Sequence, residues 1–230
     1  EAIRLEPADR PATRRGIFSE SWMIGNAVNG GVVMAAGLTA LREHLSADPE
    51  EVTEHVDPVV VSAYFMTAAA PGPFTATTEL MRAGRRLTTG QVSVWQDAAG
   101  EPADPTKPTK PTERMRAIAS FGNLDGADTY RQSTPPDLPP PDECISAEQA
   151  PPDFLRHNHF LDRVDIRLDP ATAGWAMGKP SMRGLIQGWL RLRDTREPDT
   201  TMLALALDAF PPVAFDLGLY GWTPTLEVTG

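Results

Sequence analysis

A segment near the N-terminus, residues 32–45, is the feature that most constrains this chain of 230 residues. It has the sequence VVMAAGLTALREHL, and its first ten residues carry no charged side chain. A helix that is apolar on all sides must be covered on all sides. An Asn-Gly-Gly turn (29–31) precedes the segment and Pro49 follows it, which are start and stop signals. The segment therefore predicts a helix enclosed by other structure.

Strand-like segments follow this helix, and a second apolar helix is predicted at 201–210, with Asp199 or Thr200 as its N-cap. β-branched or alternating residues predict strands at 59–66, 74–82, 87–96, 114–121, 161–168, 183–193 and 225–229. The pattern indicates the α+β class, with a long antiparallel sheet wrapped around one apolar helix, used twice. A helix lying on a flat sheet is the competing arrangement, but it would need a polar outer stripe.

Proline divides the chain. The tract from Pro102 to Pro111 predicts a long hairpin tip, and a second tract between 134 and 153 predicts a linker. We therefore expect a first domain at 1–125, a Pro-rich linker at 126–152, and a partial second domain at 153–230.

The amino-acid composition disfavours several classes of binding partner. Lys and Arg number 21 against 31 Asp and Glu, for a net charge of −10. This balance disfavours nucleic acid and anionic lipid as partners. No run reaches the ~20 apolar residues of a membrane span and the N-terminus has no signal-peptide pattern, so a cytoplasmic protein is expected. The single cysteine, Cys144, cannot form an internal disulfide.

Several short motifs follow one another along the chain. They are Ser21-Trp22-x-x-Gly25-x-x-x-Asn29-Gly30-Gly31, Ser62-Ala63-Tyr64-Phe65, the run 84–96, Ala119-Ser120-Phe121-Gly122 and Leu205-Ala206-Leu207-Asp208. Their order resembles one known family, the acyl-CoA thioesterase II-like double-hotdog proteins. The resemblance implies a tandem hotdog fold, with the second hotdog incomplete at Gly230. Two departures stand out: Val32 occupies a position where the family often has Gln, and the strands that would carry a catalytic glutamine lie beyond Gly230.

The resemblance makes Asp208 the catalytic carboxylate. It is the one charged residue between 202 and 210, and a carboxylate kept in an apolar helix usually has a partner or a task. It would activate water as a general base or attack the thioester itself. Thr225 would help to hold the water, with Thr229, on the same predicted strand face, as the second choice. The alternative is that Asp208 faces solvent near the helix end.

The turn before the first helix is the predicted substrate-binding element. Unpaired N–H groups at the start of a helix could polarise a thioester carbonyl, so Asn29, Gly30, Gly31 and Val32 are assigned to substrate binding. Tyr64 and Phe65 join them through the family motif on the next strand. The alternative is that the two glycines only form the turn and permit close helix packing.

The leading hypothesis is a thioesterase that hydrolyses an acyl-CoA, or another acyl thioester, to a free acid without cofactor or metal. The alternative is a non-catalytic acyl-binding or assembly module on the same fold, and a hotdog hydratase is third. His157 and His159 are too few ligands for zinc. The arginines 82, 85 and 86 would either meet coenzyme A phosphates or form a solvated turn. A homo-oligomer through sheet faces or edges is a further expectation.

Overall fold

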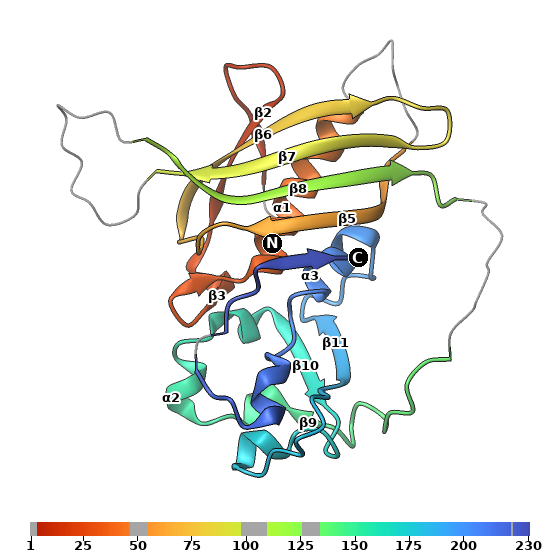
Figure 1. The fold of residues 1–230 in the computed structure, drawn as a ribbon. Coiled ribbons are helices and arrows are strands. Elements are labelled where there is room, and N and C mark those ends of the chain that lie inside the picture. The colour runs from red at the N-terminus through yellow and green to blue at the C-terminus, as the bar shows by residue number, and fades with distance from the viewer. Residues whose placement is uncertain (1–3, 47–54, 98–109, 126–133, 222) are drawn as a thin grey trace.

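The structure is a computed structural model that describes residues 4–46, 55–97, 110–125, 134–221 and 223–230 (Figure 1). Its helices are α1 (Gly30–Leu45), α2 (Pro152–Leu155) and α3 (Thr200–Ala206). Its strands are β1 (Glu6–Pro7), β2 (Thr13–Phe18), β3 (Met23–Ile24), β4 (Ala27–Val28), β5 (Asp57–Phe65), β6 (Gly72–Arg82), β7 (Thr88–Gln96), β8 (Thr112–Gly122), β9 (Ile145–Ser146), β10 (Val164–Leu168), β11 (Gly188–Leu192) and β12 (Glu227–Thr229).

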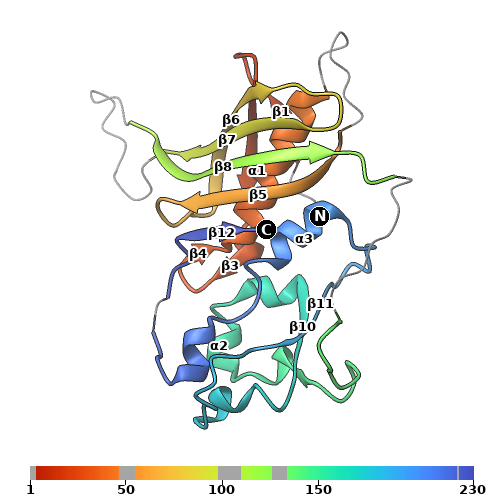
Figure 2. The ribbon, with the colours of Figure 1, turned by 45° about the vertical axis from the view of Figure 1, so that its right-hand side comes forward.

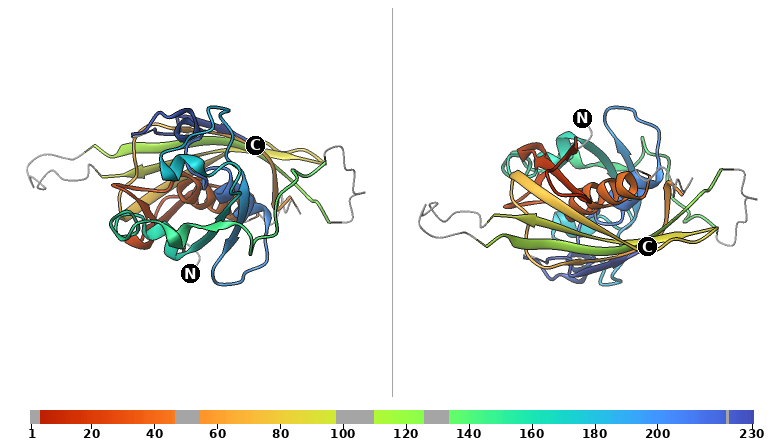
Figure 3. Two further views of the ribbon diagram at one scale, coloured as in Figure 1. Left: turned by 90° about the horizontal axis from the view of Figure 1, so that it is seen from below. Right: turned by 90° about the horizontal axis from the view of Figure 1, so that it is seen from above.

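Helix α1 forms the centre of the larger half and confirms the enclosed helix predicted from the sequence. The Asn29 side chain accepts a hydrogen bond from the Val32 N–H and so caps the first turn. Apolar residues on every side of α1 are buried, among them Val32, Met34 and Leu41. Figure 2 shows α1 passing behind the long strands, and both views in Figure 3 place it on one face of the sheet.

The main sheet is antiparallel, with the strand order β1-β2-β6-β7-β8-β5-β12. Alternate residues point toward α1, as the period of a strand requires. These inward residues include Ala76 of β6, Val92 and Val94 of β7, and Ala117 of β8, all of which are fully buried. The sheet thus removes one face of each long strand and most of α1 from water. This burial of apolar surface is the main contribution to the stability of this half.

The second half adds a small sheet and one strand of the main sheet. Strands β11, β10 and β9 form a three-stranded antiparallel sheet below the main one (Figure 1). Helix α3 packs against α1. Strand β12 then pairs with β5 in the register Val228 to Ala63. The two halves are therefore joined through a helix pair and through one shared sheet.

Several predicted bounds change. Helix α3 ends at Ala206 and not near Pro211. Beyond it the chain forms turns, in which the Asp208 N–H donates to the Leu205 carbonyl, three residues earlier, at 3.3 Å. The stretch 183–187, predicted as strand, is not strand, and a 3₁₀ turn occupies 159–162 ahead of β10. Strand β9 pairs with β10, so the second half's sheet begins inside the predicted linker.

The two proline tracts lie partly outside the described residues. Strands β7 and β8 pair in antiparallel register up to Gln96 and Thr112, which confirms the hairpin around the first tract. Most of its tip, 98–109, falls outside the described residues, as does the start of the expected linker, 126–133.

Candidate active site

The site begins at the N-terminus of α1, where Asn29 holds two segments together. Its Oδ1 accepts from the Val32 N–H at 3.1 Å, and its Nδ2 donates to the Asp208 carbonyl at 2.7 Å. Asn29 is buried, so both contacts are shielded from water. The helix cap and the turn that carries Asp208 are therefore fixed to each other by one amide side chain.

Asp208 lies directly after α3, and its carboxylate bridges two further groups. Its Oδ2 accepts from the Gly31 N–H at 3.1 Å, and its Oδ1 accepts from the Thr225 hydroxyl at 2.6 Å. The carboxylate thus sits at the positive end of α1, where a negative charge is stabilised. The structure brings together Asn29, Gly31, Asp208 and Thr225, four residues singled out from the sequence.

Both glycines are required by close packing. A Cβ on Gly30 would lie 2.6 Å from the Asp208 Oδ2 and 3.0 Å from Phe65 Cε1. A Cβ on Gly31 would fall well inside 3.0 Å of the Leu205 carbonyl oxygen, a separation that real Cβ atoms essentially never show. The missing side chain at Gly31 therefore permits the close approach of α1 to α3.

Burial is the largest influence on Asp208. It raises the pKa of the carboxyl above its usual 3.8, while the Thr225 hydroxyl and the N–H groups of Gly31 and Gly30 lower it by a smaller amount. The net direction is upward. A carboxylate with a raised pKa is a stronger base, and the Thr225 hydroxyl beside it can orient a water molecule. This arrangement suits proton abstraction from water.

The N–H groups at the start of α1 are partly used by the protein itself. Gly31 donates to Asp208 and Val32 donates to Asn29. In this structure the helix terminus therefore holds the catalytic candidate, and the carbonyl-polarising role of these N–H groups stays a prediction.

Two of the predicted residues lie elsewhere. The Thr229 hydroxyl is 3.1 Å from the Ser62 hydroxyl, and Tyr64 is 55% exposed. Both side chains lie on the face of β12 and β5 opposite to the buried Ala63. The structure therefore does not bring Thr229 or Tyr64 to Asp208, whereas Phe65, one residue on, contacts the α1 start.

Two cavities lie beside the main sheet and α1, and Asp208 lines neither of them. The first, which we call the helix groove, has a volume of about 360 Å³ and lies between α1 and α3. The second, the basic cavity, has a volume of about 910 Å³ beside β2, β6 and β7. The groove is lined by Trp22, Val32, Ala35, Ala36, Met202 and Leu205, and the cavity by Arg4, Arg10, Arg15, Trp22, Trp95 and Arg163, with other residues.

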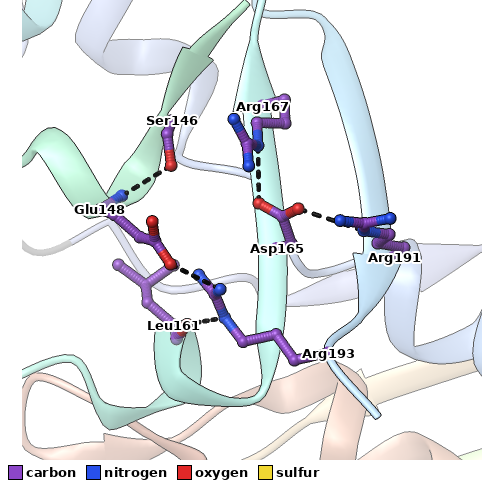
Figure 4. Close-up of polar contacts among 7 residues, drawn as sticks. All are labelled: Ser146, Glu148, Leu161, Asp165, Arg167, Arg191 and Arg193. Carbon is purple, nitrogen blue, oxygen red and sulfur yellow. Dashed lines mark hydrogen bonds and ion pairs between the residues drawn. The ribbon is translucent and has the colours of Figure 1, made fainter. Parts of the chain in front are cut away.

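The small sheet contains a buried carboxylate, Asp165, that no sequence motif singles out. Asp165 accepts from Arg167 Nε at 2.8 Å and from Arg191 Nε at 3.2 Å (Figure 4). Burial raises the pKa of Asp165, but the hydrogen bond and charge of Arg167, with smaller effects from Arg193 and Arg191, outweigh burial and leave the pKa lowered. Arg167 lies two residues along β10 from Asp165, whereas Arg191 reaches it only through the pairing of β10 with β11.

Asp216 is a second missed carboxylate. It has no solvent exposure and accepts from the Ser181 N–H at 2.8 Å, the Ser181 hydroxyl at 2.7 Å and the Leu185 N–H at 3.2 Å. The two Ser181 bonds lower its pKa to about 2 despite the opposing effect of burial. Asp216 therefore organises the loop ahead of β11 and takes no part in the Asp208 site.

The described residues include neither a metal-binding cluster nor a membrane-spanning helix. They contain no group of three or more His, Cys, Asp and Glu side chains placed to hold a metal ion. No helix in the described part of the chain is long and apolar enough to cross a membrane.

The chain is similar to several known proteins and solved structures. The mycobacterial relatives include uncharacterized proteins of Mycobacterium tuberculosis and Mycobacterium bovis, each 27% identical over 238 residues, covering 99% of this chain and 80% of the relative. A hotdog protein of unknown function from Alicyclobacillus acidocaldarius has a TM-score of 0.73 at 19% identity, covering 99% of this chain and 75% of its own.

Two further solved structures share the fold. A candidate thioesterase II from Thermobifida fusca has a TM-score of 0.75 at 24% identity, covering 99% of this chain and 77% of its own. An acyl-CoA thioesterase II from Mycobacterium marinum has a TM-score of 0.54 at 20% identity, covering 90% and 66%. These likenesses confirm the tandem hotdog fold.

Family models match both halves. The N-terminal domain of acyl-CoA thioesterase matches residues 18–122, and the C-terminal domain matches residues 141–230. The order of the two matches is that of the two halves described above, and the Asp208 site lies where the halves meet. The chain therefore belongs to the acyl-CoA thioesterase family of double-hotdog proteins.

Proposed function

We propose that this protein hydrolyses the thioester of an acyl-CoA to a free acid and coenzyme A. The observation that carries the proposal is the Asp208 carboxylate, held between the Gly31 N–H and the Thr225 hydroxyl at the junction of the two halves. The family membership supplies the thioester as the substrate class.

In the proposed reaction, Asp208 accepts a proton from a water molecule as the oxygen attacks the thioester carbonyl carbon. The tetrahedral intermediate then collapses as the C–S bond breaks, and the leaving thiolate takes the proton from Asp208, which gives free coenzyme A and restores the carboxylate. Thr225 orients the carboxylate and the water, and Asn29 is a positioning residue that holds the Asp208 main chain. General-base catalysis of this kind contributes roughly 10²–10⁴-fold in rate.

The test is release of free thiol from acyl-CoAs of several chain lengths by the purified protein, measured across pH. Because the base must be ionised, we expect kcat/KM to fall as acid protonates Asp208, with the midpoint above pH 3.8 because its pKa is raised. The variant Asp208→Ala should lose turnover, whereas Asp142→Ala, at an exposed acid distant in sequence, is the matched control. Unchanged turnover in Asp208→Ala would overturn the proposal, and saturable acyl-CoA binding with no turnover by the wild type would favour a binding module.

A further inference from the structure

The basic cavity differs in charge from the rest of the molecule. Four arginines line it, Arg4, Arg10, Arg15 and Arg163, against the carboxylates of Glu6 and Asp97. The chain as a whole has a net charge of −10. A concentration of guanidinium groups in an acidic protein creates a local field that attracts an anion. The planar guanidinium fits phosphate oxygens through paired hydrogen bonds.

Arg163 is the central residue of this argument. Its side chain is half-buried, yet it makes no hydrogen bond or ion pair with any described residue. The neighbouring arginines of the small sheet differ, because Arg167 and Arg193 have carboxylate partners (Figure 4). The Arg163 guanidinium therefore has its donors available for the oxygens of a ligand anion.

Aromatic side chains lie beside the arginines. Trp22 and Trp95 both line the basic cavity, and each is partly exposed. The flat face of an aromatic ring stacks on a nucleobase, which contributes about 1–3 kcal/mol in single-stranded nucleic-acid complexes. Arginines with tryptophans in a cavity of about 910 Å³ therefore fit a phosphorylated nucleoside better than a simple inorganic anion.

The basic cavity and the helix groove adjoin each other. Trp22 and Arg163 line both cavities. The Trp22 carbonyl accepts from the Asn29 N–H at 3.0 Å, and the Asn29 side chain donates to Asp208. Val32 and Leu205 of the groove directly adjoin the Gly31 contact. A ligand could therefore extend from the basic cavity past Trp22 to Asp208.

We propose that the basic cavity binds the phosphorylated nucleotide end of coenzyme A, with the pantetheine arm passing Trp22 along the helix groove to Asp208. This proposal rests on the hydrolysis of acyl-CoA proposed above and names where the carrier is recognised. The proposal also assigns coenzyme A binding to the arginines of the basic cavity and not to those of the turn after β6. Arg85 and Arg86 are exposed at the turn after β6 and line neither cavity, so they serve as charge-matched controls.

The first experiment measures binding of coenzyme A itself by calorimetry, which needs no turnover. We compare the wild type with Arg163→Gln, Arg10→Gln and the control Arg85→Gln. Loss of a charged hydrogen bond predicts about a tenfold weaker Kd for Arg163→Gln, a smaller loss for Arg10→Gln, and no change for Arg85→Gln. Absence of coenzyme A binding by the wild type, or equal weakening in Arg85→Gln, would overturn the proposal. Circular dichroism of each variant checks its fold.

The second experiment compares three thioesters with one acyl group: acyl-CoA, acyl-4′-phosphopantetheine and acyl-pantetheine. The proposal predicts the lowest KM for acyl-CoA, and a fall of about tenfold in this preference in Arg163→Gln. If all three substrates have equal KM, hydrolysis stands and the nucleotide site is refuted. If a single phosphate gives the full preference, the site recognises phosphopantetheine and the nucleotide assignment is wrong. If coenzyme A binds at Arg163 but no thioester is hydrolysed, the proposed function fails while the site stands.

Discussion

Replacement of Gly31 by alanine is the perturbation whose effect follows most directly from the geometry. The added Cβ would meet the Leu205 carbonyl oxygen well inside 3.0 Å, and this oxygen belongs to main chain that cannot rotate away. Overpacking of this kind costs about 1–3 kcal/mol. Alanine returns only about 0.5–1 kcal/mol of that through its better helix propensity. Because the clash is with main chain, the cost lies near the upper end of this range, and we expect the free energy of unfolding to fall by roughly 2 kcal/mol.

The same substitution should reduce activity. Moving α1 away from Leu205 also displaces Asp208, which follows Leu205 by one turn and bonds the Gly31 N–H. Urea unfolding and thiol-release kinetics measure the two effects. The matched control is Gly37→Ala in the same helix, where the flexible Met115 Cε at 2.8 Å is the one contact under 3.0 Å and the Val92 and Val94 side chains lie at 3.4 and 3.5 Å. The reasoning is refuted if Gly31→Ala matches the wild type in stability and kcat, or if Gly37→Ala is equally damaging.

Three further predictions concern side-chain hydrogen bonds. Thr225→Val removes the hydroxyl at nearly constant shape and should lower kcat at least tenfold, whereas Thr225→Ser should retain most activity; equal kcat values would contradict this. Asp216 has a lowered pKa, so the stability it contributes is present above pH 3.8 and is lost as pH falls toward 2; Asp216→Asn should flatten urea midpoints across that window. Asp165→Asn should lower the free energy of unfolding by about 1–3 kcal/mol without changing KM, as read from urea unfolding and steady-state kinetics.

The sequence was sufficient where a local pattern determines the outcome. Residues 32–41 have no polar stripe, so α1 had to be enclosed, and the structure buries it. Asp208 could be selected because it is the only charge in an otherwise apolar segment. Asn29 could be recognised as a cap because its side chain acts on a residue three positions away.

The sequence was insufficient where long-range pairing decides the position of a side chain. Thr225 and Thr229 look equivalent on one strand, but β12 begins only at Glu227, and pairing with β5 turns Thr229 toward Ser62. Asp165 looks like any strand acid until β11 places Arg191 opposite it. The burial of Asp216 likewise depends on a loop more than thirty residues away in the chain.

The most direct test of the central claim is the rate of thiol release from one acyl-CoA by Asp208→Asn, compared with wild type and Asp142→Asn. Asparagine keeps the size of the side chain and an oxygen for the Gly31 N–H, so the fold should be retained, and equal melting temperatures verify this. The account predicts a fall in kcat of roughly 10²–10⁴-fold for Asp208→Asn and none for the control. A folded Asp208→Asn variant with wild-type kcat would contradict the account.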